Sequence, residues 1–313
     1  MAASGSTFYF PWEVALMKWL QTHISGGGIS IISLFSAFGE ALLLILILGF
    51  VYWDYDKKLG RTMALSIFMG LVWNTMLKNI FLRRRPYFDH DDIHILRVPD
   101  PEADIDDIAA QGYSFPSGHS TNAVTVYGSL GLYLHKRYLT AAAIVIPFLI
   151  GFSRIVVGAH YPTDVLAGWL LGLLSVLLVH LLEKRVPNLL LSYGILLITA
   201  IPGFFYCKTT DYFNSIGLLI GFMGGTLLED HCVHFENTRK PLWMIARMLG
   251  GLAVFLALNQ LLKLPFSEEF LSSSSFGALM VRCIRYAIIA FVEFGVYPML
   301  FKFEKKVTKE MVK

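Results

Sequence analysis

Charged residues are scarce in this chain of 313 residues. They make up 16% of the sequence, against about 25% in an ordinary soluble domain, whereas 55% of the residues are hydrophobic. The net charge of +3 is small and the basic residues form no single block, which argues against nucleic acid as a partner. The composition therefore predicts an all-α, polytopic bundle of membrane helices with the lipid bilayer as its surroundings.

Cysteine is also rare. Cys207, Cys232 and Cys283 are too few and too scattered for a disulfide framework or a zinc site, so we expect free thiols. The first seven residues contain no basic residue, and the first long apolar run starts late. We therefore expect no cleavable signal peptide.

Long apolar segments recur along the whole chain. Residues 8–24 combine Trp12, Trp19, Glu13 and Lys18 with apolar residues, which is typical of a helix lying in the membrane interface. About nine later segments have the length, or nearly the length, to cross about 30 Å of hydrocarbon. The predicted spans are residues 29–53, 62–82, 120–134, 141–157, 165–182, 189–206, 213–228, 242–262 and 278–301.

Basic residues are unevenly divided between the predicted loops. One set of alternate loops carries most of those outside the motifs described below: Lys57, Lys58, Arg61, Lys136, Arg137, Lys184, Arg185, Arg239, Lys240 and the lysines after residue 301. The positive-inside rule places this set in the cytoplasm. The N-terminus and the opposite loops are then expected to face outward.

Residues 112–122, called the second motif below, are the middle one of three stretches with polar residues at the ends of predicted spans. Their core, Pro116-Ser117-Gly118-His119, stands directly before an apolar run and should begin a helix. Free backbone N–H groups there, the Ser117 hydroxyl and the Gly118 backbone describe a phosphate cradle. His119 lies where it can exchange a proton with a bound group. By itself, such a stretch is more often turn and cap chemistry.

Two flanking stretches favour the functional interpretation. In the upstream stretch, the first motif, Lys78 is followed after six residues by Arg85. In the downstream stretch, the third motif, Arg154 is followed after five residues by His160 and after three more by Asp164. A charge at the bilayer centre costs roughly 2.5 to 3.5 kcal/mol, so these cations should lie at a wet rim or face a strong anion. Phosphate is such an anion. Asp164 can hold one ring nitrogen of His160 and leave the other free to attack phosphorus.

This three-part pattern resembles the type-2 phosphatidic acid phosphatase superfamily, which includes glucose-6-phosphatase and the vanadium haloperoxidases. The resemblance is strongest over residues 78–171. It implies that His160 forms a phosphohistidine intermediate and that His119 protonates the leaving oxygen. The residues then expected to bind the phosphate are Lys78, Arg85, Ser117, Gly118 and Arg154. Fixed cations can replace Mg²⁺ in this chemistry, so neither metal nor cofactor is implied, and vanadate is expected to inhibit.

Several charged residues are expected to lie outside this site. Arg83 and Arg84 are interpreted as interfacial residues. The acidic loop 89–107 lacks an EF-hand or zinc spacing and is predicted to be a solvated lid, and the cluster around Glu229 a polar loop. Glu40, inside the first predicted span, is either a functional carboxylate near the motif cations or part of a structural ion pair.

The motifs and spans together predict three parts: an interfacial helix in residues 1–28, a catalytic core in 29–185 and a C-terminal transmembrane extension in 186–313. The last part resembles the C-terminal region of sphingosine-1-phosphate phosphatases. The second motif departs from that subfamily, because it reads Pro-Ser-Gly-His where the subfamily has Pro-Ser-Thr-His.

The predicted function is a metal-independent membrane phosphatase. Its expected substrate is a lipid phosphate or diphosphate: a polyprenyl diphosphate, phosphatidylglycerol phosphate, phosphatidic acid or a sphingoid phosphate. We expect it in the plasma membrane, with its site on the extracytoplasmic or lumenal side. Two alternatives stay open: a phosphatase of soluble sugar phosphates, similar to glucose-6-phosphatase, and a lipid-binding or transport protein with an inactive phosphatase site.

Overall fold

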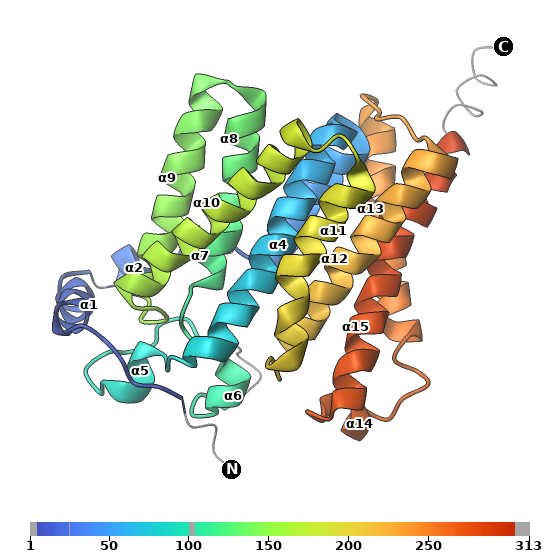
Figure 1. Ribbon diagram of the computed structural model, residues 1–313. Coiled ribbons are helices and arrows are strands. Elements are labelled where there is room, and N and C mark those ends of the chain that lie inside the picture. The colour runs from blue at the N-terminus through green and yellow to red at the C-terminus, as the bar shows by residue number, and fades with distance from the viewer. Residues whose placement is uncertain (1–4, 25, 100–103, 304–313) are drawn as a thin grey trace. The chain divides into compact units, whose positions relative to one another are not determined.

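Helices are the only regular elements in the part of the chain that the computed structural model describes, residues 5–24, 26–99 and 104–303 (Figure 1). The predicted all-α class is confirmed. Five helices in this part are long and apolar enough to cross a membrane: α4 (Lys57–Phe81), α9 (Arg137–Val156), α10 (Pro162–Arg185), α12 (Thr210–Leu228) with its continuation η4 (Glu229–Val233), and α13 (Pro241–Leu261). The count of about nine spans stays a prediction.

Three other predicted spans are formed by consecutive helical segments. They are α7 (Gly118–Ala123) with η2 (Val124–Gly128) and α8 (Ser129–Leu134); α11 (Leu189–Ala200) with η3 (Ile201–Phe205); and α15 (Phe276–Phe291) with η5 (Val292–Val296) and η6 (Tyr297–Phe301). Short helices α5 (Pro86–Asp89), α6 (Ile108–Gln111) and α14 (Glu268–Ser272) lie in the connections. The three cysteines are free, as expected.

The first predicted span, residues 29–53, is interrupted. Helix α2 (Gly27–Ala37) ends before residue 38, and α3 (Ala41–Phe50) begins at residue 41 and continues into η1 (Val51–Tyr55). A Cβ atom at Gly39 would lie 3.0 Å from Ile150 Cγ2 and 3.2 Å from His119 Cδ2. Glycine fits this close approach, but it is a poor helix former, and the helix breaks here.

Glu40 lies in this break and forms an ion pair with Arg97. Arg97 also donates a hydrogen bond from NH1 to the carbonyl oxygen of Ser33, over 3.0 Å. Of the two interpretations that the sequence left open for Glu40, these contacts support the structural ion pair.

The chain divides into two compact units. The first comprises Met1–Leu44 and Trp73–His180, and the second Ile45–Val72 and Leu181–Lys313. In the first unit, α9 packs against α2, α7, η2 and α8, and α1 (Pro11–His23) packs against α9 (Figure 1). Every residue predicted for the site belongs to this first unit.

The second unit is built around a close helix pair. Glycines of α12 face backbone carbonyls of α15, and a Cβ atom at Gly225 would lie 3.0 Å from the oxygen of Phe291. Small residues allow such an approach between membrane helices. The acidic cluster predicted to be a polar loop instead continues α12 as η4: Glu229 is fully buried and pairs with Lys57 over 2.8 Å. The loop prediction was wrong there because a lysine on another helix satisfies the buried carboxylate.

Candidate active site

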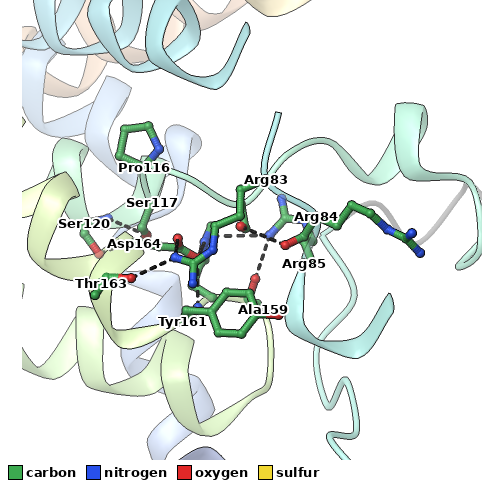
Figure 2. A network of polar contacts seen from close by, with 12 residues as sticks. Arg83, Arg84, Arg85, Pro116, Ser117, Ser120, Ala159, Tyr161, Thr163 and Asp164 are labelled. Carbon is green, nitrogen blue, oxygen red and sulfur yellow. Dashed lines mark hydrogen bonds and ion pairs between the residues drawn. The ribbon is translucent and has the colours of Figure 1, made fainter. Parts of the chain in front are cut away.

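The Pro-Ser-Gly-His stretch begins a helix, as its sequence predicts. Ser117 is the N-cap residue of α7, and its Oγ atom accepts hydrogen bonds from the backbone N–H of Ser120 at 3.4 Å and from the Ser120 hydroxyl at 2.9 Å (Figure 2). Asn74 of α4 donates from Nδ2 to the oxygen of Pro116 at 3.2 Å and to Oγ1 of Thr121 at 3.1 Å. The loop before α7 is therefore held from two sides.

Helix α10 supports this loop through its backbone. A Cβ atom at Gly168 would lie 2.6 Å from the Ser117 oxygen, and one at Gly172 would lie 2.7 Å from the Thr121 oxygen. The backbone N–H of Ser117 donates to the backbone oxygen of Asp164 over 2.9 Å. The glycine pair of α10 thus sets the position of the second motif against the third.

Arg85 joins the first motif to the third. Its Nε atom donates to the oxygens of Gln111 and Gly112, both at 3.0 Å, and its NH1 atom to the oxygen of Ala159 at 3.0 Å (Figure 2). NH1 also lies 3.3 Å from Nε2 of His160. The guanidinium is buried, with 5% of the residue exposed, and three carbonyl oxygens fix its plane.

The tautomer of His160 follows from this contact. A guanidinium has donors and no acceptor, so Nε2 of His160 must accept and the neutral ring carries its proton on Nδ1. That Nδ1 atom lies 3.5 Å from Oδ2 of Asp164. The two groups are close, but Nδ1 makes no hydrogen bond among the described residues, so the holding of His160 by Asp164 stays a prediction. Nε2 faces the guanidinium of Arg85.

Three more of the predicted site residues, His119, Arg154 and Lys78, interact electrostatically with His160. His119 interacts electrostatically with Arg154, His160, Arg85 and Lys78. Arg154 is buried with 2% exposed, and its NH1 atom lies 3.5 Å from the hydroxyl of Ser36.

His160 is buried among these cations. Burial, followed by the positive charges of Arg85, Arg154 and Lys78, holds the pKa of His160 well below its ordinary value. This environment keeps the imidazole neutral and favours a bound anion.

The interfacial interpretation of Arg83 is wrong. Arg83 is completely buried, and its NH1 atom donates to Oδ1 of Asp164 over 2.6 Å, whereas Arg84 points away from this cluster and pairs with Asp89 (Figure 2). The buried charge of Arg83 is balanced by Asp164 and by Glu13 of α1, whose Oε2 atom lies 2.8 Å from NH2.

Sequence reasoning missed the role of Glu13 in this cluster, although a signal was present. Glu13 shares the buried face of α1 with Met17 and Leu20, which follow it at helical spacing. A carboxylate on an apolar stripe requires a buried partner.

The acidic loop is anchored to α1. Ile93 is buried with 3% exposed and packs against Val14, Met17 and Tyr161, and Lys18 of α1 pairs with Asp92. Two of its predicted acidic positions, Asp100 and Glu102, lie outside the described residues. Described residues of this loop therefore combine a buried apolar contact with exposed charge, and a fully solvated lid is too simple a description.

Known protein families match the part of the chain that carries the three motifs and much of the part that follows it. The PAP2 superfamily matches residues 59–187, and the transmembrane extension of PAP2 superfamily phosphatases matches residues 213–307. Phosphatidylglycerophosphatase B of Bacillus subtilis is 32% identical over 157 residues, which are 47% of this chain and 70% of that protein. The chain belongs to the PAP2 superfamily. With its extension and its apolar helices, it is a multi-pass membrane phosphatase of that superfamily.

One further relative and two solved structures are also similar to the chain. An undecaprenyl-diphosphatase of Sulfolobus acidocaldarius is 32% identical over 120 residues, covering 37% of this chain and 51% of that protein. Among solved structures, Aquifex aeolicus LpxE is 25% identical with a TM-score of 0.47, covering 54% of this chain and 95% of LpxE. A phosphatidylglycerolphosphate phosphatase from Bacillus subtilis is 28% identical with a TM-score of 0.45, covering 56% of this chain and 86% of that one.

Proposed function

We propose that this PAP2 phosphatase hydrolyses a lipid phosphate or diphosphate while the lipid stays in the bilayer, through a phosphohistidine on His160, at the extracytoplasmic or lumenal face. The observation that carries the proposal is the position of His160: its unprotonated Nε2 atom lies 3.3 Å from the guanidinium of Arg85, and Arg154 and Lys78 act on the same ring. A nucleophile surrounded by fixed cations suits phosphoryl transfer, where catalysis is mostly positioning and charge stabilisation.

The reaction has two proposed steps. In the first, Nε2 of His160 bonds to the terminal phosphorus, the bond from that phosphorus to the oxygen of the leaving lipid or lipid phosphate breaks, and His119 gives its proton to that oxygen. In the second, His119 takes a proton from water as the water oxygen attacks the phosphohistidine, which releases inorganic phosphate and restores both histidines. Asp164 faces Nδ1 of His160 and would stabilise the positive charge that the ring acquires.

Two observations favour a lipid over a soluble substrate. The relatives named above act on phosphatidylglycerophosphate and undecaprenyl diphosphate by their names. In addition, α10 exposes Leu166 and Leu170, which are 54% and 59% exposed, within two turns of Asp164. Moving an acyl or prenyl chain into water costs about 0.8 kcal/mol per CH₂. A substrate whose tail stays beside such leucines avoids this cost.

The test is phosphate release by purified protein in vesicles, across polyprenyl diphosphate, phosphatidylglycerol phosphate, phosphatidic acid, a sphingoid phosphate and glucose-6-phosphate. We expect at least one lipid to be hydrolysed with a higher kcat/KM than glucose-6-phosphate, and the His160→Ala variant to be inactive on all of them. A preference for glucose-6-phosphate over every lipid would overturn the lipid assignment.

The proposed side of the membrane needs a second measurement. In sealed vesicles of known protein orientation, lipid confined to the leaflet that corresponds to the cytoplasmic one should be spared. Hydrolysis of that lipid without transfer between leaflets would contradict the outward-facing site.

A further inference from the structure

Glu13 is a fully buried carboxylate on a helix whose outer face is apolar. Helix α1 exposes Trp12 and Trp19, at 51% and 56%, while Glu13 has no exposed surface. Each of its carboxylate oxygens has partners. Oε1 accepts from the backbone N–H of Thr163 at 3.0 Å and from its hydroxyl at 2.6 Å, and Oε2 accepts from the backbone N–H of Phe10 at 2.9 Å and from Arg83 at 2.8 Å.

Arg83 links this carboxylate to the third motif. Its NH2 atom donates to Glu13, its NH1 atom to Asp164 at 2.6 Å and to Thr163 Oγ1 at 2.8 Å, and its Nε atom to the oxygen of Phe8 at 2.8 Å. The guanidinium carbon lies 3.9 Å from the ring centroid of Tyr161 and 4.5 Å from that of Phe8. A planar group with this many fixed contacts cannot rotate (Figure 2).

The two oxygens of Asp164 have different tasks. Oδ1 accepts from Arg83, while Oδ2 accepts from the backbone N–H of Tyr161 at 2.8 Å and faces Nδ1 of His160 at 3.5 Å. Arg83 therefore fixes the carboxylate that faces the histidine. Glu13 acts on it twice, through Arg83 and through Thr163, which precedes Asp164 in the first turn of α10.

Charge balance gives Glu13 a second effect. One guanidinium is shared between two carboxyl groups, so the cluster of Glu13, Arg83 and Asp164 has one acidic group more than it has basic groups next to His160. Without the Glu13 charge, Arg83 would neutralise Asp164 alone, and the site would stabilise a positive imidazole less well.

From these contacts we infer that Glu13 and Arg83 are positioning residues for the phosphatase reaction, acting through Asp164 on His160. The inference rests on the proposed function, because it requires His160 to be the nucleophile. It adds α1 to the catalytic apparatus, although the PAP2 match begins only at residue 59.

The N-terminal segment is built into the site in other ways as well. The Ser6 backbone pairs with residues next to Arg83, by Ser6 N–H to the Leu82 oxygen at 2.8 Å and Arg84 N–H to the Ser6 oxygen at 2.9 Å. Gln21 donates from Nε2 to the oxygen of Val156 at 3.0 Å, at the end of α9. These contacts hold α1 against the first and third motifs. They therefore fix the position of Glu13 relative to Arg83 and Asp164.

The experiment compares Glu13→Gln with Lys18→Gln in the full-length protein. Glutamine keeps the shape of Glu13 and removes its charge. Lys18 lies on the same helix and pairs with the exposed Asp92, so its variant removes a contact of α1 that does not lead to Asp164. Each protein is assayed for kcat, KM and the pH dependence of kcat/KM on one lipid substrate, with thermal unfolding in detergent as the measure of folding.

We expect Glu13→Gln to lower kcat by about 10- to 100-fold. This is the range found in metalloenzymes when the groups that orient a metal-bound histidine are removed. KM should stay within about twofold, because the phosphate ligands are intact. The acidic limb of kcat/KM should move to lower pH, since a less negative surrounding disfavours the charged imidazole. Lys18→Gln should match the unaltered protein in all three quantities.

A second variant covers the case in which Glu13→Gln does not fold. Arg83→Lys keeps one positive charge between the carboxylates, but a single ammonium cannot replace the fork that reaches Glu13, Asp164, Thr163 and Phe8. We expect the same loss in kcat with KM little changed. The double variant Glu13→Gln/Arg83→Lys should be about as slow as the slower single variant, because both residues act through one carboxylate.

Two outcomes would overturn the inference. One is a kcat for both Glu13→Gln and Arg83→Lys within about twofold of the unaltered protein; the other is a loss of kcat in Glu13→Gln without any movement of the acidic limb, which is what a merely structural role would give. Neither outcome would contradict the proposed function, because that proposal is tested by the inactivity of His160→Ala. An active His160→Ala variant would instead overturn the proposed function.

Discussion

The NH1 atom of Arg85 donates a hydrogen bond to Nε2 of His160 across 3.3 Å. This is the nitrogen that we propose as the phosphoryl acceptor, so an incoming phosphate must enter where the two side chains meet. Arg85 keeps its bonds to the oxygens of Gln111, Gly112 and Ala159, and it can therefore exchange the ring nitrogen for a phosphate oxygen without turning. Such a preorganised donor needs no reorganisation during the reaction.

The first prediction concerns pH. The pKa of His160 is held well below its ordinary value by burial and then by Arg85, Arg154 and Lys78. A lowered pKa means that the ring stays neutral, and hence nucleophilic, at pH values where an ordinary histidine is protonated. The acidic limb of kcat/KM, which reports the free enzyme, should thus lie below about pH 6.5.

The control for this measurement is the substrate. A phosphate monoester titrates near pH 6 itself, so profiles for an alkyl phosphate and for the more acidic nitrophenyl phosphate should be compared, and the limb that does not move with the substrate belongs to the enzyme. A common limb at or above pH 6.5 would contradict the environment described for His160.

A second prediction separates the two histidines. His160→Ala should abolish turnover and any phosphoenzyme trapped by acid quench. His119→Ala should lose about 10²- to 10⁴-fold on substrates with poor leaving groups, the usual contribution of general acid catalysis. A nitrophenyl phosphate, whose leaving group needs little protonation, should lose far less. Equal losses on alkyl and nitrophenyl phosphates would count against His119 as the acid.

Chelation and vanadate provide a third prediction. Lys78, Arg85 and Arg154 would neutralise the transferring phosphoryl group, so activity should persist in EDTA. Vanadate, which adopts the five-coordinate geometry of the transition state, should inhibit in competition with substrate. Loss of activity in EDTA that Mg²⁺ restores would instead assign a metal role to the acidic loop.

The fourth prediction tests the support that α10 gives to the phosphate cradle. In Gly168→Ala, the new Cβ atom would lie 2.6 Å from the Ser117 oxygen, so the loop or the helix must shift. Such a shift should lower kcat by up to about 10²-fold, since displacements on the order of 1 Å have this effect at active sites. It should also destabilise the protein by about 1 to 3 kcal/mol, as overpacking does.

Gly194→Ala is the matched control for this substitution. Gly194 lies inside α11, and a Cβ atom there meets no other atom within 4 Å. Activity should be unchanged, and stability should rise by roughly 0.5 to 1 kcal/mol because alanine is the better helix former. A Gly168→Ala variant that behaves like Gly194→Ala would show that the approach of α10 to Ser117 is not needed.

The sequence by itself determined the membrane class, most helix positions and the three motifs, because each depends on local spacing. Ser117 caps α7 through the adjacent turn, and the separation of His160 from Asp164 places the two side chains together at the start of α10. Chain geometry over a few residues fixes such contacts, whatever the rest of the protein does.

Only the tertiary structure decided that Arg83 and Glu13 are buried and paired with each other. By composition rules a charged side chain belongs in water, and these rules led to the interfacial interpretation of Arg83. The contacts that make burial favourable join residues far apart in the chain, 70 positions between Glu13 and Arg83 and 81 between Arg83 and Asp164. A contact at such a distance leaves no periodic pattern in the sequence, and its charges are satisfied only once α1, the first motif and α10 have been brought together.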